Sequence, residues 1–232
     1  MATAIVTGGS RGLGRALVEA LAERGWRVVT TARTAAELEQ AWPTQGAHTA
    51  EVVAIAGDVT DEAHRRRIVE LASERGDLAL LVNNAGTLGP TPLPALATLP
   101  LAALDATLHD NAVAPLALTQ LALPALRGAG GTVVNVTSDA AVEGYAGWGA
   151  YGAAKAALEQ LSRVLGAEEP AVRVLVVDPG DMRTRMHQDA FPGEDISDRL
   201  PPEASVPGFL ALIEGEQPSG RYVARELGAP AR

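Results

Sequence analysis

The chain of 232 residues contains no cysteine. This absence excludes disulfide bonds, thiolate metal sites and a cysteine nucleophile, and it leaves the redox compartment without an indicator. Lysine is almost as scarce, because Lys155 is the only lysine and the other eighteen of the nineteen basic residues are arginines. Aromatic residues make up only 3% of the chain, so a group of them near a candidate site is informative.

Positive charge is also in deficit. Nineteen basic residues stand against 28 acidic ones, which gives a net charge of -9. Such a field repels nucleic-acid phosphates and anionic lipid surfaces, so we expect neither nucleic acid nor a membrane as a partner. The amino terminus has no basic segment followed by an apolar one, and no apolar run approaches about 18 residues, which predicts a cytoplasmic protein.

Long linkers and internal repeats are missing as well. Hydrophobic residues account for 47% of the chain and charged residues for 20%, which is enough for a full core and gives no sign of disorder. The length lies within the range of one α/β domain. We therefore expect a single dinucleotide-binding catalytic domain over residues 1–232.

The sequence does contain short β-branched runs that alternate with longer helical patterns. Most of these runs are nearly continuous in hydrophobicity, which is typical of parallel strands covered on both faces by helices. The pattern predicts an α/β fold with a doubly wound, Rossmann-like parallel sheet. The predicted strands are residues 4–6, 27–30, 51–55, 78–82, 132–136 and 173–177, with a further edge strand at 221–224.

Helical spacing of apolar residues predicts crossover helices between these strands. They span residues 13–24, 61–75, 101–127 and 151–165, and Pro115 and Pro124 are expected to bend or end the third of them. The stretch 181–207 differs, because it is rich in Pro, Asp and Gly and follows the last central strand. We predict that it forms a mobile lid over a substrate site.

A glycine-rich turn joins the first strand to the first helix. Glycine permits positive φ and close approach of a pyrophosphate, and the helix N-terminus offers free N–H groups. The spacing of the glycines is looser than the strict dinucleotide fingerprint, so a turn without a ligand is the alternative. The placement after the first strand favours dinucleotide binding. The residues predicted to contribute are Gly8, Ser10, Arg11, Gly12, Leu13 and Gly14.

The end of the second strand indicates which dinucleotide is bound. An acidic residue there would bond the adenosine ribose, whereas an arginine would receive a 2′-phosphate. Arg33 lies at this point, Arg11 is available from the glycine turn, and no acid appears before Glu37. We therefore expect NADP(H) as the cofactor, with NAD(H) left open; the alternative is that both arginines are simply solvated.

Two later turns fit the same cofactor. Asp58 and Val59 follow the third strand, where they are placed to contact adenine. Asn83, Ala85 and Gly86 belong to an Asn-Asn-Ala-Gly segment after the fourth strand, against which a cofactor would lie. Since Asn, Asp and Gly favour turns in any case, simple turn chemistry is the alternative.

Tyr151 and Lys155 are the candidate reacting centre. Their spacing of four residues puts a phenol and an ammonium on the same face of one helix. A neighbouring ammonium stabilises phenolate and would lower the pKa of the tyrosine, as general acid/base catalysis requires. Ser138, at the end of the fifth strand, would present its hydroxyl to a substrate carbonyl. A solvated pair and a serine that caps the next segment are the alternatives.

In chain order, the glycine turn, Asn-Asn-Ala-Gly, Ser138, Tyr151-x3-Lys155 and the Asp-Pro-Gly at 178–180 resemble the short-chain dehydrogenase/reductase (SDR) family. The resemblance covers essentially the whole chain, and the combination is highly specific. It implies a Rossmann-like fold with a seven-stranded parallel sheet. It also implies assembly as a homodimer or homotetramer through the long helices.

The same resemblance implies roles for the site residues. Tyr151 would donate the proton to a carbonyl oxygen or abstract it from an alcohol, and Ser138 would orient that oxygen. Lys155 would bind the nicotinamide ribose and lower the pKa of the tyrosine, and Asn111 would hold a proton-relay water. The residues that match the family segment beside the nicotinamide are Pro179, Gly180 and Thr184.

The substrate pocket is expected between Ser138, Tyr151 and the predicted lid. Two aromatic residues close before Tyr151 suggest a stacking surface for a bulky or cyclic substrate, although core packing explains them equally well. The four histidines lack metal-like spacing, so no metal site is predicted. The candidate pocket residues are Asp139, Ala140, Tyr145, Trp148, Met182, Met186, His187 and Phe191.

These patterns together predict an NADP(H)-dependent oxidoreductase of carbonyl reductase or alcohol dehydrogenase type. It would reduce a small ketone or aldehyde, or oxidise a secondary alcohol, by hydride transfer. Fold does not settle chemistry, so a non-redox enzyme on the same scaffold is an alternative, such as an epimerase, dehydratase or cyclase. A non-catalytic dinucleotide sensor is another, but it would have no need to keep Ser138, Tyr151 and Lys155 together.

Overall fold

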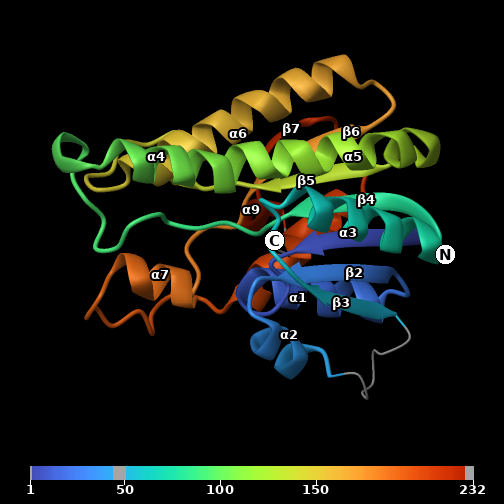
Figure 1. Cartoon of the computed structure of the whole chain (residues 1–232), viewed down its shortest axis with the longest axis horizontal. Coiled ribbons are helices and arrows are strands. Elements are labelled where there is room, and N and C mark those ends of the chain that lie inside the picture. The colour runs from blue at the N-terminus through green and yellow to red at the C-terminus, as the bar shows by residue number, and fades with distance from the viewer. Residues whose placement is uncertain (1, 44–50, 228–232) are drawn as a thin grey trace.

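The computed structural model describes residues 2–43 and 51–227, and these residues form one seven-stranded parallel sheet. The strand order is β3-β2-β1-β4-β5-β6-β7 (Figure 1). This confirms the predicted doubly wound fold, and the edge strand joins the sheet in the same direction as the others. The strands are β1 Ala2–Thr7, β2 Arg27–Ala32, β3 Val52–Ala56, β4 Asp77–Asn83, β5 Thr132–Val136, β6 Arg173–Asp178 and β7 Gly220–Val223.

Helices separate the strands along the chain. The four predicted helices are present, and α3 begins where the Asp61 carboxylate caps it by accepting from the N–H of Ala63 at 3.0 Å. Four short helices were not predicted: α2, α7, α8 and α9. The bounds are α1 Gly12–Glu23, α2 Ala35–Ala41, α3 Glu62–Arg75, α4 Leu101–Leu108, α5 Ala114–Ala129, α6 Gly149–Glu168, α7 Arg185–Ala190, α8 Val206–Glu214 and α9 Ala224–Leu227.

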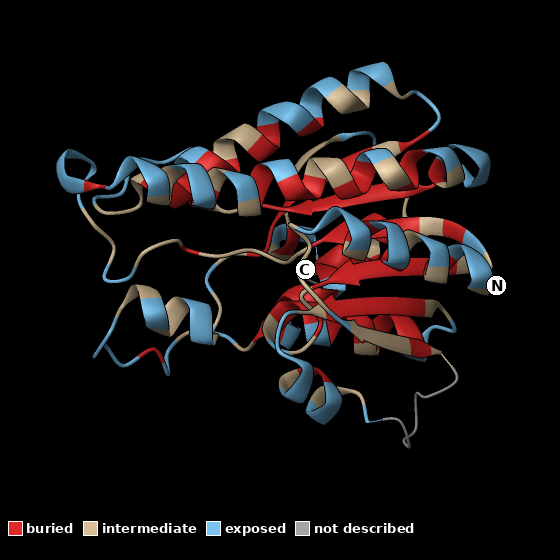
Figure 2. Cartoon of the chain, in the orientation of Figure 1, coloured by how far each residue is buried: buried red, intermediate tan, exposed pale blue. Residues whose placement is uncertain are grey.

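The core consists of two apolar layers, one on each face of the sheet. Alternate residues of a strand point to opposite faces, so Ala4 and Val6 pack with α1 and α8, whereas Ile5 packs with α3 and α5. The central strands are buried along almost their whole length (Figure 2). Burial on both faces explains why the strand sequences are continuously hydrophobic rather than alternating.

The strand order reverses between β1 and β4. β1 pairs with β2 on one side and with β4 on the other, so the chain crosses the sheet in opposite directions from this point. Loops that leave the carboxyl ends of β1 and β4 therefore diverge and leave a crevice between them, which is where open α/β sheets bind ligands.

A single long helical stretch covers residues 101–129. It comprises α4, a π-helical turn at His109–Val113 and α5, and it continues past both prolines that were expected to bend or end it. Pro115 lies directly after the π-helical turn, inside the continuous stretch, and α5 continues through Pro124. Among the described helices, Leu101–Ala129 alone is long and apolar enough to span a membrane; here α5 packs on β4 and α3 as a core helix.

The last residues of the segment predicted as a lid, 202–207, are not a loop over the site. Residues 181–201 contain α7 and irregular chain, but Pro202 and Ser205 are buried, and α8 follows at once. Val206 and Phe209 belong to the core layer of α1. The Pro and Gly content of this segment suggested a loop, yet Pro207 lies in the first turn of α8, where proline is well tolerated.

Phe209 tests this correction, because its side chain is 0% exposed. We expect Phe209→Ala to lower the free energy of unfolding by about 3–5 kcal/mol, since it removes a large ring and leaves a cavity. Leu200→Ala is the control just before the buried residues of this segment, where the side chain is 52% exposed, and it should change stability by less than about 0.5 kcal/mol. Urea unfolding followed by circular dichroism measures both; equal, small effects would place residues 205–214 outside the core.

Candidate active site

A cavity of about 850 Å³ opens at the carboxyl edge of the sheet. It is lined by the glycine turn, the chain after β2, β3 and β4, the end of β5, part of α6 and the segment after β6. Segments far apart in sequence thus meet at the predicted edge. The sequence-predicted residues that line it are Gly8, Ser10, Arg11, Gly12, Leu13, Gly14, Arg33, Asp58, Val59, Ala85, Gly86, Tyr151, Lys155, Pro179, Met182, Thr184 and Met186.

The glycine turn is built for close backbone approach. Gly8 and Gly12 have φ values of 74° and 56°, which side chains rarely adopt. A Cβ on Gly14 would lie 2.2 Å from the Gly8 carbonyl oxygen, whereas a Cβ on Gly12 would meet only Thr184 Cγ2 at 3.6 Å. Arg11, the residue before α1, makes no side-chain hydrogen bond to the first turn of the helix. The turn thus offers an open cradle and an uncapped helix N-terminus, which suit a pyrophosphate.

Thr7 and Asn84 join the ends of β1 and β4 across the switch in strand order. The Thr7 hydroxyl accepts from the backbone N–H groups of Asn84 and Ala85, both at 3.0 Å. The Asn84 side-chain amide donates to the Thr7 carbonyl at 2.8 Å. The turn after β4 is therefore fixed against the glycine turn.

Asn83, predicted as a cofactor contact, lies outside the cavity. It is 3% exposed, and its amide donates to Asn135 Oδ1 at 2.8 Å and to the Thr119 hydroxyl at 3.1 Å. Neighbouring residues of a strand point to opposite faces of the sheet, which the sequence motif alone does not indicate. Asn83 is still inside β4 and faces the core beneath α5, whereas Asn84 is the first residue beyond it.

Arg33 lines the cavity beyond the end of β2. Burial would raise the pKa of the nearby Asp58 carboxyl, but two hydrogen bonds from Thr60, at 2.8 and 2.9 Å, and the charge of Arg33 lower it. Asp110, which was not predicted, lies in the same region, and burial raises its pKa despite the charge of Arg33. Arg33 thus stands as a cation among carboxyl groups at the far end of the cavity from Tyr151.

Arg11 is already paired, which the sequence did not indicate. Its Nη1 lies 3.1 Å from both carboxylate oxygens of Glu37, at the beginning of α2. Arg185 of α7, within the segment predicted as a lid, reaches the same carboxylate, with Nη1 3.6 Å from Oε1. Glu37 therefore holds an arginine from the glycine turn and another from the lid beside the region of Arg33.

Tyr151 and Lys155 lie together on the buried side of α6, with 8% and 4% of their surface exposed. The Lys155 ammonium is 5.5 Å from the centre of the Tyr151 ring and donates to the Val136 carbonyl at 2.9 Å. Burial lowers the pKa of Lys155 to about 8. The i,i+4 spacing thus placed the pair correctly on one face of the helix.

The pKa of Tyr151 moves opposite to the prediction. Burial raises it, and the charges of Asp178 and Asp139 raise it further, while a hydrogen bond with Ser138 lowers it. The predicted lowering by Lys155 does not outweigh these effects, because the ammonium lies over the ring and bonds a carbonyl rather than the phenol oxygen. In this geometry Tyr151 is held as the protonated phenol.

Ser138 has neighbours that compete for its hydroxyl. Its Oγ donates to Asp139 Oδ1 at 2.8 Å and accepts from the N–H of Ala140 at 3.2 Å, which caps the 3₁₀ turn Asp139–Ala141. Asp139 also accepts from the Tyr145 hydroxyl at 3.0 Å, which raises the pKa of Tyr145. Ser138 therefore serves as a cap, although it does not itself line the cavity.

Asn111 is fully buried in the π-helical turn His109–Val113. Its Oδ1 accepts from the N–H of Thr87 at 3.1 Å, and its Nδ2 donates to the carbonyls of Thr87 and Thr107, both at 2.9 Å. A Cβ on Gly86 would lie 2.6 Å from Asn111 Oδ1. The side chain thus holds the loop after β4 in place, rather than facing the cavity itself.

The predicted substrate residues divide into two groups. Met182 and Met186 line the cavity. Trp148 instead packs edge-on against Tyr151, with ring centres 5.7 Å apart, and against Phe191, at 5.9 Å. It therefore forms an aromatic wall between the reacting centre and the lid, so the packing interpretation describes its contacts.

The remaining substrate candidates lie at the margin. Tyr145 is 47% exposed. His187 packs its ring 4.9 Å from that of Phe191, its Nδ1 lies 3.8 Å from Asp181, and its Nε2 is buried with no hydrogen-bond partner among the described residues. Gly180 also lies off the cavity lining, with its N–H donating to Asp178 Oδ1 at 2.9 Å.

The sequence did not reveal several lining residues. Most of those named below belong to the loop after Asn-Asn-Ala-Gly and to the segment between β6 and α8; Asp110 lies in the π-helical turn next to Asn111, which gave a usable signal. Across residues 2–43 and 51–227, no group of three or more His, Asp or Glu gathers to hold a metal ion. The cavity-lining residues that were not predicted include Thr87, Leu88, Gly89, Thr91, Asp110, Asp189, Pro202 and Glu203.

Comparisons with known proteins agree with this geometry. A family model described as short chain dehydrogenase matches residues 2–195. Sepiapterin reductase of Mus musculus is 38% identical over 200 residues, which cover 81% of this chain and 77% of that protein. A tropinone reductase homolog of Arabidopsis thaliana is 36% identical over 199 residues, covering 84% and 73%. An alcohol dehydrogenase structure from Thermococcus sibiricus, complexed with 5-hydroxy-NADP, superposes with a TM-score of 0.85 at 25% identity and covers 100% and 99%.

Burial of Lys155 predicts a pH-dependent stability. Between its folded pKa of about 8 and its ordinary value of 10.5, the unfolded state binds more protons at Lys155 than the folded state, so stability rises with pH in this window. We expect the free energy of unfolding of the parent, relative to Lys155→Met, to increase from about pH 8 to about pH 10. The raised pKa of Tyr151 acts in the other direction only above its ordinary value of 10.0. Urea titrations across the window measure the difference, and a flat difference would contradict the lowered pKa of Lys155.

Proposed function

Because this chain belongs to the short-chain dehydrogenase/reductase family, we propose that it is an NADP(H)-dependent oxidoreductase with Tyr151 as the general acid/base. Members of the family are oxidoreductases that use NAD(P)(H). The proposed reaction reduces a ketone or aldehyde, or oxidises a secondary alcohol. One observation carries it: a single cavity is lined both by the glycine turn and by Tyr151 and Lys155.

The residues present fit a dinucleotide along the whole cavity. The open face of Gly12 and the uncapped N-terminus of α1 would take the pyrophosphate. Asp58 and Val59 would flank the adenine, and Lys155 would bond the nicotinamide ribose. When bound, the cofactor supplies or accepts the hydride, and the protein supplies orientation and proton transfer.

The proton is handled by Tyr151. As a protonated phenol it can donate to a carbonyl oxygen that gains negative charge, which general acid catalysis requires. Ser138, whose hydroxyl acts to lower the pKa of Tyr151, would orient the same oxygen. Lys155 would stabilise the phenolate left behind through its positive charge. The aromatic wall of Trp148 and Phe191 helps to exclude water from this end of the cavity.

Arg33 supports NADP(H) over NAD(H). A guanidinium offers forked donors to a phosphate, and Arg33 lies where the second strand ends. Glu37 is paired with Arg11 and Arg185 rather than free to bond a ribose. The similar Thermococcus sibiricus structure is complexed with an NADP derivative.

Assembly as a homodimer or homotetramer is part of the proposal. The long helices that would form the interface carry apolar side chains that face solvent in a single chain: Leu101, Val113, Leu161 and Val164, between 37% and 75% exposed. Such residues on adjacent helices support association. Sedimentation as a single species of 23.9 kDa would contradict it.

Tyr151→Phe tests the proton donor. The variant keeps the ring packed against Trp148 but removes the hydroxyl, so we expect kcat to fall by about 10²–10⁴-fold with little change in cofactor binding. The assay follows NADPH consumption with a panel of ketones and aldehydes. Tyr222→Phe is the matched control, since that hydroxyl donates to the Pro218 carbonyl and Tyr222 does not line the cavity.

Two results would contradict the proposed function. If Tyr151→Phe kept parental turnover, Tyr151 would not be the donor. If the parent bound NADPH but gave no net oxidation or reduction with any carbonyl or alcohol, the non-redox alternative would be favoured.

Arg33→Ala tests the cofactor assignment. Charge-assisted hydrogen bonds contribute about 1.5–3 kcal/mol, so the KM for NADPH should rise by about ten- to one-hundredfold. The KM for NADH should change less than about threefold, because it lacks the 2′-phosphate. Arg24→Ala, which removes a surface partner of Glu214, is the control. Equal effects on both cofactors would refute the role of Arg33.

A further inference from the structure

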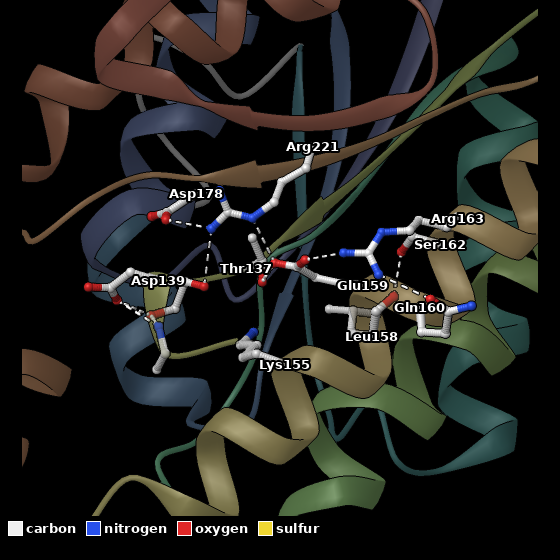
Figure 3. A network of polar contacts seen from close by, with 12 residues as sticks. Thr137, Asp139, Lys155, Leu158, Glu159, Gln160, Ser162, Arg163, Asp178 and Arg221 are labelled. Carbon is white, nitrogen blue, oxygen red and sulfur yellow. Dashed lines mark hydrogen bonds and ion pairs between the residues drawn. The ribbon is translucent and has the colours of Figure 1, made fainter. Parts of the chain in front are cut away.

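A buried ionic cluster of Glu159, Asp178 and Arg221 lies near Lys155 (Figure 3). Glu159 of α6 is 1% exposed and Asp178 at the end of β6 is 6% exposed, and Arg221 of β7 reaches between them. Arg221 donates from Nε to Glu159 Oε1 and from Nη2 to Asp178 Oδ2, both at 3.0 Å. None of the roles proposed above involves this arginine.

Glu159 connects Arg221 to two parts of the site. It follows Lys155 by one helical turn on α6, so the two side chains lie on the same side of the helix. Its Oε1 also accepts from the Thr137 hydroxyl at 2.9 Å. Thr137 lies between the end of β5 and Ser138. Through Glu159, Arg221 is thus linked to the helix that carries Lys155 and to the residue that precedes Ser138.

Asp178 connects Arg221 to the third part. Its Oδ1 accepts from the N–H of Gly180 at 2.9 Å and so shapes the turn after β6. Arg221 Nη2 also donates to the Ser138 carbonyl, at 3.5 Å. One guanidinium therefore joins the chain around Ser138, helix α6 and the Asp-Pro-Gly turn.

The charges explain why an arginine is needed. Two buried carboxylates are costly unless each is paired and hydrogen-bonded. Arg163 pairs with the other oxygen of Glu159 at 2.9 Å, but its side chain is 52% exposed, compared with 26% for Arg221. Arg221 pairs with both carboxylates at once, through Nε to Glu159 and Nη2 to Asp178, which matches the fixed planar fork of a guanidinium.

We infer that Arg221 is a positioning residue. It neutralises the two buried carboxylates behind Tyr151 and holds together the three segments that carry the candidate catalytic groups. The inference rests on the proposed function, because it concerns the proton transfer at Tyr151.

The groups around Tyr151 fix the sign of the expected effect. Asp178 and Asp139 oppose its ionisation, and Lys155 lies 5.5 Å from its ring. Ala190 of α7 packs against the cluster that contains Tyr151, and the titratable or charged residues of α7 are Arg185, His187 and Asp189. Without Arg221, Asp178 loses its ion-pair partner, so its charge acts on Tyr151 unopposed. The pKa of Tyr151 then rises, and the same field raises the pKa of Lys155.

The test is the pH profile of kcat in the NADP(H)-saturated enzyme. The apparent pKa that this profile gives for Tyr151 or Lys155 marks one limb of the curve. In Arg221→Met this limb should move to higher pH by about one pH unit in both reaction directions. Asp178→Asn, which keeps an acceptor for Gly180, should move it down by a similar amount. The KM for NADPH should stay within about twofold of the parent, because Arg221 does not line the cofactor cavity.

Arg163→Met is the matched control. It removes an arginine from the same Glu159 carboxylate but touches neither Asp178 nor Ser138. Its exposed charge is screened by water, so the limb should shift by less than about 0.3 pH units. Arg221→Lys keeps the positive charge but loses the planar guanidinium that joins the segments. We therefore expect the limb of the pH profile to stay in place while kcat falls.

Amide hydrogen exchange gives a readout without turnover. In Arg221→Met the N–H groups of Ala140 and Gly180 should exchange about tenfold faster, whereas those of β1 should not change, and Arg163→Met should match the parent. An unshifted pH limb, or unchanged exchange at both amides, would overturn the inference.

Failure of the proposed function is separable from this result. A parent without carbonyl or alcohol turnover would refute the proposed function, and exchange would still decide whether Arg221 holds the segments. If Arg221→Met does not fold, Arg221→Lys and Asp178→Asn decide. The inference is overturned if the limb of the kcat profile does not move to lower pH in Asp178→Asn.

Discussion

The hydrogen bonds between Thr7 and the turn after β4 define the geometry on which the site depends. One hydroxyl accepts from two consecutive backbone N–H groups, those of Asn84 and Ala85, across the point where the strand order reverses. The crevice at such a point is a property of the topology, but its width depends on what joins its two sides. Thr7 fixes the glycine turn relative to the loop after β4, and Asn111 holds that loop from the other end through Thr87. The floor of the cavity is therefore rigid on both sides.

Charge is distributed unevenly around this rigid floor. At its outer rim the ion pairs are exposed to solvent. There Glu37 pairs with Arg11 of the glycine turn and with Arg185 of α7. Exposed pairs of this kind contribute little to stability and rearrange readily. Behind the reacting centre, by contrast, Asp178, Glu159 and Arg221 are largely shielded from solvent and hydrogen-bonded. The contacts at the Arg33 end of the cavity are thus adaptable, while those at the Tyr151 end are fixed.

Much of this arrangement followed from the sequence. Continuous β-branched runs gave the parallel sheet, and the i,i+4 spacing placed Tyr151 and Lys155 side by side, because both patterns depend on local periodicity. The direction of the Tyr151 pKa did not follow, since burial and the charge of Asp178 come from tertiary packing. Asn83 and Asn84 differ only in which side of a strand end they face. Arg221, 83 residues after Ser138, carries no local signal that links it to the site.

Lys155 has a consequence outside catalysis. Apart from the amino terminus, it is the only primary amine in the chain, and with a pKa of about 8 much of it is neutral, and so nucleophilic, in mildly alkaline solution. Acylating reagents, which in most proteins modify many surface lysines, would here have one side-chain target, at the bottom of the cavity. Any ligand that fills the cavity would shield it. The extent of acylation at Lys155 would therefore report whether the cavity is occupied.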